Sequence, residues 1–346
     1  LCEHSIVMNK KKGSENMDKK ELQNPALYTN RELSWLLFNK RVLSEARDKQ
    51  LLLFERLKFL SITASNLDEF FMVRIGSLVD MIHAEYTKKD IAGMSAKEQL
   101  DALMEETHKF AALQYSTYNR MLLPQLRANG LNFVEHHEQL TERQAQYVDE
   151  YFEENVYPVL TPMAVDSSRP FPLIRNKTLN IGALVAKKGE KDTEIEFATV
   201  QVPSVLPRVV RIPAAKEGDT EVAVLLLEEI IERNISKLFL NYNVLCAHPF
   251  RITRNADLAI DEDEAEDLLL EIEKQIKKRT WGQAIRLEIE AAADRRLLKI
   301  LCRELSVRKE DVFEIDGPLD LTFLMKVYGE SYMRIVFMKF RFQIFS

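Results

Sequence analysis

The periodicity of the sequence changes near residue 130, and this change limits the folds that the chain can adopt. From about residue 26 to residue 128, apolar residues recur at steps of three and four, the spacing of one helix face. After Gly130, short strand-like runs alternate with helical segments. At 346 residues, the chain also exceeds one typical domain. The pattern therefore predicts an all-α helical bundle followed by an α+β domain.

We expect four segments along the chain. Residues 1–25 are mainly charged and turn-forming and lack the apolar core of a signal peptide, which predicts a disordered leader. Residues 26–129 form the helical domain, and residues 130–325 form an α+β domain around one sheet. Residues 326–346 alternate between aromatic and basic residues and follow neither pattern, so we interpret them as a truncated or aberrant tail.

Capping signals mark helix starts in the first domain. Thr29 with Glu32, and Ser95 with Glu98, have the spacing of a capping box. An interruption is expected near Pro124.

The second domain mixes strands and helices. Strands are predicted at residues 178–186, 196–202, 208–213, 243–255, 284–290 and 311–315. Helices are predicted at residues 140–156, 224–239, 262–279 and 293–305. In "AIRLEIE" (284–290) apolar and charged residues alternate, so Arg286 and Glu288 share one face.

Composition excludes several classes of protein. With 48 basic and 54 acidic residues, the formal charge of −6 argues against a dedicated nucleic-acid binder. The widely spaced Cys2, Cys246 and Cys302 include no CxxC pair, which fits a reducing cytoplasm. No run approaches the ~18 apolar residues of a membrane span. The chain is expected to be cytoplasmic, without a transmembrane segment.

Several catalytic motifs are absent. The nearest two glycines, Gly182 and Gly189, are too far apart for a P-loop or a GxGxxG turn. GxSxG and HExxH are also missing. His136 and His137 are the only histidines close in sequence, but neighbours in a short loop rarely both reach one ion. We therefore predict no metal site and no catalytic residue from the motifs.

Two basic stretches could face an anion. "SSRPFPLIRNK" carries Arg169, Arg175 and Lys177, and "HPFRITRN" carries Arg251 and Arg254. The last two share a strand face only if a bulge intervenes, because odd spacing alternates faces. Surface charge or ion pairing is the alternative for both stretches, and composition alone favours it.

Asn66 allows two interpretations. It precedes an apolar helical pattern that begins at Leu67, and Glu69 three residues on could complete a capping box. Its amide could instead bind a ligand, because it offers an acceptor and two donors. The residues alone favour the cap.

Several stretches together resemble the bacterial polyphosphate kinase family, which makes inorganic polyphosphate from ATP. They occur in the family's order and cover roughly residues 27–329: "NRELSWLLFNKRVLSEA", "LLFERLKFLSITASNLDEFFMVRIGSL", "PVLTPMAVDSSRPFP", "FRITRNADLAIDEDEAEDLL", "RLEIE" and "EIDGPLDLTFLMKVYG". The resemblance implies that the helical part is the family's N-terminal domain and the following part its head domain.

The resemblance also implies a reaction. The terminal phosphate of ATP passes reversibly to a histidine and then to the growing polyphosphate chain. That histidine and the ligands of Mg²⁺ belong to two C-terminal, phospholipase D-like domains that have no counterpart here. In the family the asparagine of "NLDEFF" contributes to ATP binding, which identifies Asn66 as an ATP-binding residue. Phe59 is a candidate for the base pocket.

These expectations define an enzyme, a phosphotransferase, whose partners are ATP or ADP, inorganic polyphosphate and further copies of itself. The chain alone is expected to be inactive because the catalytic domains are missing. The alternative is a non-catalytic truncated module that binds ATP or pairs with full-length kinase subunits. Nucleic-acid binding through the basic tail fits poorly with the acidic total.

Overall fold

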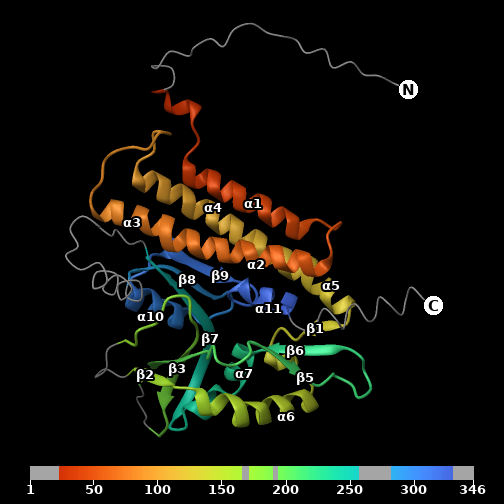
Figure 1. Ribbon diagram of the computed structural model, residues 1–346. Helices are drawn as coiled ribbons and strands as arrows, with labels where there is room; N and C mark the ends of the chain where they lie inside the picture. Colours follow the sequence, from red (N-terminus) through yellow and green to blue (C-terminus); the bar gives the residue numbers. More distant parts are fainter. Residues whose placement is uncertain (1–22, 166–170, 190–193, 257–281, 330–346) are drawn as a thin grey trace, which may run out of the picture.

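A layer of helices lies against a mixed α/β region in the computed structural model (Figure 1). The structure describes residues 23–165, 171–189, 194–256 and 282–329. The predicted succession of a helical region and a mixed α/β region is confirmed within these residues. The predicted helix at 262–279, Arg169, residues 1–22 of the leader and residues 330–346 of the tail lie outside them.

The helical layer consists of α1 (Arg31–Arg47), α2 (Leu53–Phe70), α3 (Gly76–His83), α4 (Ala96–Thr117) and α5 (Leu123–Ala128). Single π-helical turns, Phe71–Ile75 and Tyr118–Leu122, join α2 to α3 and α4 to α5. The expected interruption near Pro124 is therefore confirmed. Pro124 lies in the first turn of α5, where its missing N–H disturbs no intrahelical bond.

The capping predictions had different outcomes. Ser95 and Glu98 form the predicted capping box of α4. The prediction for Thr29 is wrong by one residue, because Asn30 caps α1 by accepting hydrogen bonds from the backbone N–H groups of Glu32 and Leu33. The side chain of Asn30 is buried. Its oxygen accepts the capping hydrogen bonds, and its nitrogen donates to the side chains of Asp90 and Gln99.

The predicted helix start at Asn66 is wrong. Asn66 lies inside α2, whose N-cap residue is Leu52. Asparagine has a modest helix propensity, so a packed helix can pass through it at little cost. Burial of Leu57, Leu60 and Leu67 on the inner side of α2 outweighs that cost.

The mixed region contains two sheets, so the expectation of one sheet is wrong. The larger has the order β2-β4-β3-β7-β8-β9, with β2 (Met163–Val165), β3 (Leu179–Lys187), β4 (Glu196–Gln201), β7 (Tyr242–Arg254), β8 (Ala284–Glu290) and β9 (Val312–Ile315). The smaller has the order β1-β6-β5, with β1 (Leu131–Phe133), β5 (Val209–Ile212) and β6 (Val222–Leu226).

Helices flank these sheets: α6 (Glu142–Tyr151), α7 (Leu227–Arg233), α8 (Ile235–Leu238), α10 (Arg295–Leu305) and α11 (Leu324–Gly329). The helix predicted at 224–239 begins too early, because its first residues belong to β6. A short apolar run does not distinguish a buried strand from a helix, and pairing with β1 and β5 decides this one.

One hydrophobic core joins the helical layer to the sheets. It includes Leu57 and Leu60 of α2, Phe313 of β9 and Val224 of β6. A second cluster lies between the larger sheet and α10, with Leu287 and Leu301 among its members. The continuous first core makes the helical layer and the sheets parts of one packed structure. In the described part of the chain, no helix has the length and apolar character needed to cross a bilayer.

Gly76 marks a close contact between these parts, which yields a prediction. A Cβ atom at Gly76 would lie 2.2 Å from Oδ1 of Asn255. Alanine normally stabilises a helix by ~0.5–1 kcal/mol relative to glycine. Here we expect Gly76→Ala to lower the free energy of unfolding by ~1–3 kcal/mol, because the Asn255 side chain must move.

Urea denaturation measures this effect, with Ser77→Ala as the neighbouring control in the same helix. A more stable Gly76→Ala variant would contradict the close contact.

Candidate functional site

Asn66 is half-buried on α2 and contacts α1. Its Nδ2 donates to Oδ1 of Asn39, at 3.1 Å. Asn39 is buried, and its own Nδ2 donates to the carbonyl oxygen of Thr63. Asn66 Oδ1 accepts no hydrogen bond from the described residues, so it keeps an acceptor for a ligand.

Phe59 lies seven residues before Asn66 on the same helix. Seven residues are about two turns, so the two side chains project from the same side of α2, about 10 Å apart along its axis. Phe59 is partly buried against the main core. The structure thus places the two candidate nucleotide-binding residues on one side of one helix.

Asp68, two residues beyond Asn66, faces the sheet and is only 2% exposed. Arg251 of β7 binds it through both terminal nitrogens, with Nη1 3.0 Å from Oδ1. Arg286 of β8 donates to the same Oδ1. Glu288 of β8 accepts from both arginines, at 2.7 and 2.9 Å. We call Asp68, Arg251, Arg286 and Glu288 the Asp68 cluster.

The electrostatics of the Asp68 cluster favour the charged forms. Burial alone would raise the pKa of Asp68, but the positive charges of Arg251, Arg286 and Lys177 hold it well below its usual range. Arg286 also lies over the ring of Phe71, with its guanidinium carbon 4.6 Å from the ring centroid. Nη2 of Arg251 also lies 4.0 Å from Oδ1 of Asp320. With Lys177 and Asp320, three basic and three acidic side chains therefore meet in the interface between α2 and the sheet.

The basic stretches have structural roles in the described residues. Arg251 belongs to the Asp68 cluster. Arg254 is buried and donates to the carbonyl oxygens of Ile174 and Gly282. A shared strand face for Arg251 and Arg254 requires a bulge between them. The register between β7 and β8 does shift after Thr253. For Arg251 the structure therefore favours the ion-pair alternative over a free anion site.

The loop before β3 carries basic side chains that solvent can reach. Arg175 and Lys177 are exposed. Nζ of Lys177 lies 3.5 Å from Oδ2 of Asp68, and its backbone carbonyl accepts a hydrogen bond from Arg251. Lys177 therefore covers the outer side of the Asp68 cluster.

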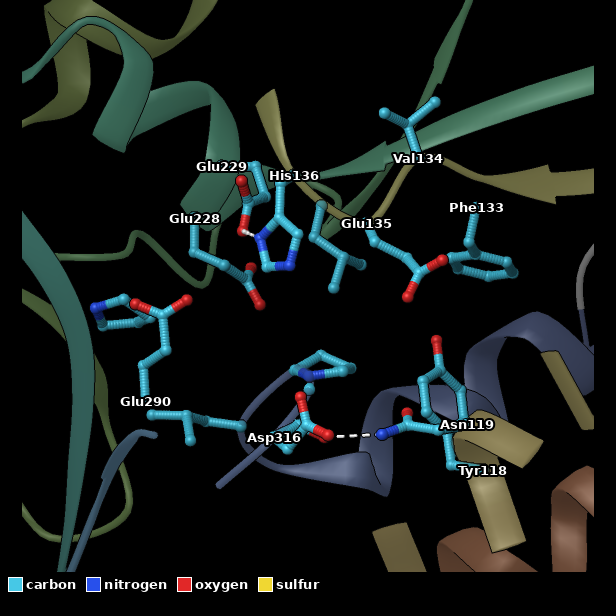
Figure 2. Close-up of a pocket in the computed structure, with 15 residues that line it drawn as sticks. Tyr118, Asn119, Phe133, Val134, Glu135, His136, Glu228, Glu229, Glu290 and Asp316 are labelled. Carbon is cyan, nitrogen blue, oxygen red and sulfur yellow. Dashed lines mark hydrogen bonds and ion pairs between the residues drawn. The ribbon is translucent and has the colours of Figure 1, made fainter. Parts of the chain in front are cut away.

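An acidic pocket opens between α7 and the loop after β9 (Figure 2). Its lining includes Glu135, Glu228, Glu229, Glu290 and Asp316. Phosphate groups would be repelled by this surface. The acidic pocket is therefore poorly suited to phosphate groups.

A second pocket lies near the start of α1 and has the opposite character. Arg31, Arg74, Lys88 and Lys89 line it together with the aromatic Tyr86. Glu32 neutralises part of this charge by pairing with Arg31 and Arg74. The remaining basic side chains suit phosphate oxygens. Sequence analysis did not identify this pocket, because its lining residues come from four separate stretches of the chain.

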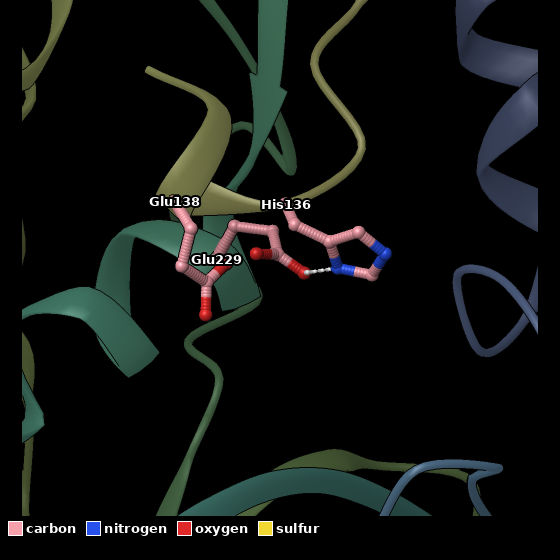
Figure 3. Close-up of side chains that lie close together, drawn as sticks. All are labelled: His136, Glu138 and Glu229. Atoms are coloured by element: carbon pink, nitrogen blue, oxygen red, sulfur yellow. Dashed lines mark ion pairs between the residues drawn. The ribbon is translucent and has the colours of Figure 1, made fainter.

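His136 and His137 lie beside α7 rather than around one common ion position. Nδ1 of His136 is 3.8 Å from Oε1 of Glu229 (Figure 3). Nδ1 of His137 is 3.3 Å from Oε2 of the same residue. In the potential metal-binding groups of the described residues, the two histidines fall into separate sets. Glu229 belongs to both sets.

Comparisons with known proteins identify the family. The model of the polyphosphate kinase N-terminal domain matches residues 28–134, and that of the polyphosphate kinase middle domain matches residues 143–327. The chain therefore belongs to the polyphosphate kinase family.

Individual relatives agree with this assignment. A polyphosphate kinase of Halalkalibacterium halodurans is 48% identical over 311 residues, which are 89% of this chain and 43% of that protein. One of Bacillus anthracis is 46% identical, over 89% of this chain and 44% of that protein. The crystal structure of polyphosphate kinase from Porphyromonas gingivalis matches with a TM-score of 0.69 and 26% identity, over 86% of this chain and 40% of that chain. This chain thus spans less than half the length of these relatives.

The Asp68 cluster yields a prediction on stability. Asp68→Asn keeps the side-chain size but leaves Arg251 and Arg286 with Glu288 as their main counter-charge. We expect the free energy of unfolding to fall by ~3–5 kcal/mol, because an uncompensated buried charge remains. Urea denaturation measures it, with the exposed neighbour Glu69→Gln as control. Equal stability of both variants would show that the Asp68 cluster does not hold the interface.

The stabilising effect of Asp68 is expected to depend on pH. The lowered pKa of folded Asp68 stabilises the protein above the unfolded value of ~3.9, and this contribution is lost as pH falls towards the folded value. The stability difference between the original protein and Asp68→Asn should be constant above about pH 5 and shrink below about pH 4. Denaturation curves between pH 7 and pH 3 test this, and a difference that grows in acid would contradict it.

Proposed function

We propose that this chain supplies the N-terminal and head portions of an ATP:polyphosphate phosphotransferase. The reaction transfers the terminal phosphate of ATP reversibly to the end of an inorganic polyphosphate chain. The observation that carries the proposal is the match to both family models, supported by 48% identity to a polyphosphate kinase. The catalytic steps are assigned to phospholipase D-like domains outside this chain.

The histidine that receives the phosphate is assigned to those domains as well. Among the described histidines, His136, His137 and His248 face carboxylates, which would repel a phosphoryl group. His108 stacks on Phe313 and contacts the carbonyl oxygen of Glu310. The surroundings of these four histidines therefore favour a nucleophile located elsewhere, while the fifth described histidine, His83, is exposed on α3.

Magnesium is assigned in the same way. Each group of described side chains that could hold an ion contains a histidine. Mg²⁺ prefers an octahedral shell of oxygen atoms, including several waters. The described residues therefore fit this ion poorly, and we place it with the catalytic domains.

Asn66 is proposed to bind ATP through its amide. Its Oδ1, which accepts from none of the described residues, suits an amino group such as the one on adenine. Phe59 on the same side of α2 offers an aromatic surface to the base. Its hydrogen bond to Asn39 fixes the orientation of the amide.

The alternative is a non-catalytic module that pairs with full-length kinase subunits. The continuous core of the described residues favours it, because such a core allows the chain to fold by itself. Co-expression with an intact relative distinguishes the two proposals. A module that pairs changes the assembly or activity of the intact enzyme, and no change in either contradicts this alternative.

The proposed activity is tested in a protein that joins this chain to the remaining domains of a relative. With ATP and Mg²⁺, we expect an acid-labile polymer, whereas the chain alone should form none. If the joined, folded protein formed no polymer, the proposed function would fail.

Asn66→Ala in the joined protein tests the ATP site. We expect ATP binding to weaken by ~1–3 kcal/mol, about five-fold to over a hundred-fold in Kd, because a ligand hydrogen bond is lost. ATP titration measures this, with the exposed neighbour Ser65→Ala as control. Unchanged ATP affinity with a lowered Tm would assign Asn66 a structural role through Asn39.

A further inference from the structure

Five histidine and glutamate side chains converge between α7 and the neighbouring strands of the larger sheet. His137, Glu229, Glu232, His248 and Glu290 form this group, which we call the His–Glu cluster. Glu229 and Glu232 are three residues apart on α7 and therefore lie on one side of it. His248 comes from β7 and Glu290 from the end of β8.

Among the described residues, no arginine or lysine forms an ion pair with the His–Glu cluster. The ion pairs that Glu229 and Glu290 form with described residues involve histidines alone. The side chain of Glu232 forms no hydrogen bond or ion pair with another described residue. Three carboxylates thus meet in a partly buried space without an arginine or lysine among their described partners.

The spacing suits a metal ion. The ligand atoms of Glu232, His248 and Glu290 all lie within 4.8 Å of one another, and so do those of His137, Glu229 and Glu232. Ligand bonds of ~2.0–2.2 Å around Zn²⁺ require ligand atoms ~3.3 Å apart. Small side-chain rotations close this gap. Nδ1 of His248 lies 2.8 Å from Oε2 of Glu290, so these two atoms would move slightly apart when an ion replaces the proton that they share.

We propose that the His–Glu cluster binds one divalent transition-metal ion of the Zn²⁺ class through Glu232, His248 and Glu290. Imidazole nitrogen together with carboxylate oxygen favours this class over Mg²⁺. Glu229 and His137 lie beside the ion and supply further negative charge and a hydrogen-bonding partner. This proposal does not depend on the proposed catalytic function.

The ion would connect the two sheets. Glu232 belongs to α7, which directly follows β6 of the smaller sheet. His248 and Glu290 belong to adjacent strands of the larger sheet. An ion held by residues from both sides stabilises their packing, because it binds only when the folded structure brings its ligands together. The expected effect of the ion is therefore on the stability of the fold.

Zn²⁺ binding to the full chain tests the proposal. After treatment with a chelator, the protein is dialysed against Zn²⁺ and its metal content is determined by mass spectrometry, while thermal unfolding is followed in parallel. We expect one Zn²⁺ per chain and a higher Tm, both reversed by the chelator. Glu232→Gln and His248→Gln should each weaken binding by at least about ten-fold. A ten-fold excess of Mg²⁺ should not displace the ion.

Two variants serve as controls. His83→Ala removes an exposed histidine on α3 and should bind Zn²⁺ like the original protein. His136→Ala removes the exposed histidine that belongs to a different group with Glu138 and Glu229 (Figure 3), and it should also retain binding.

Three results would overturn the proposal. The first is a folded protein that takes up no Zn²⁺. The second is wild-type affinity in both Glu232→Gln and His248→Gln. The third is loss of the ion in His136→Ala with retention in His248→Gln, which would move the ion to the loop. Glu232→Gln keeps the side-chain volume, and its Tm without metal verifies that it folds.

Discussion

The buried pairing of Asp68 with Arg251 and Arg286 is the interaction on which the arrangement of the molecule depends. Two guanidinium groups cannot lie inside a protein without counter-charges, and Glu288 alone does not balance them. The carboxylate of Asp68 therefore has to reach the sheet, which fixes the position of α2 over β7 and β8. The positions of α1 and α4 depend on α2 in turn, because both helices pack on it.

The same requirement orients the candidate ATP-binding residue. Residues two positions apart on a helix point in nearly opposite directions, about 200° apart. Because Asp68 points into the sheet, Asn66 points towards α1 and the outer surface, where it contacts Asn39. One short motif thus joins two parts of the fold through its aspartate and leaves its asparagine available to a ligand. Asn66 therefore does not cap a helix in the structure. It contacts α1 through Asn39, while Asp68 contacts the sheet through Arg251.

Local patterns predicted much of the fold. The Ser95 capping box, the alternation in β8 and the apolar strands of the larger sheet depend on neighbours in sequence, so they could be identified. The separate smaller sheet could not, because β6 is a strand only through its pairing with β1 and β5. The charged side of β8 carried a signal for the Asp68 cluster, since Arg286 and Glu288 share that face. Asp68, the partner of Arg286, lies 218 residues away in sequence, so local spacing could not identify it. The His–Glu cluster was hidden for the same reason.

The central claim is that the helical layer and the sheets form one cooperative unit held by the Asp68 cluster. Native-state hydrogen exchange tests it most directly, by comparing the opening free energies of backbone amides in the middle of α2 and in β7. The account predicts equal values for the slowest amides of both elements, with a common decrease in Asp68→Asn. Amides of α2 that exchange with a much lower free energy while β7 stays protected would contradict it.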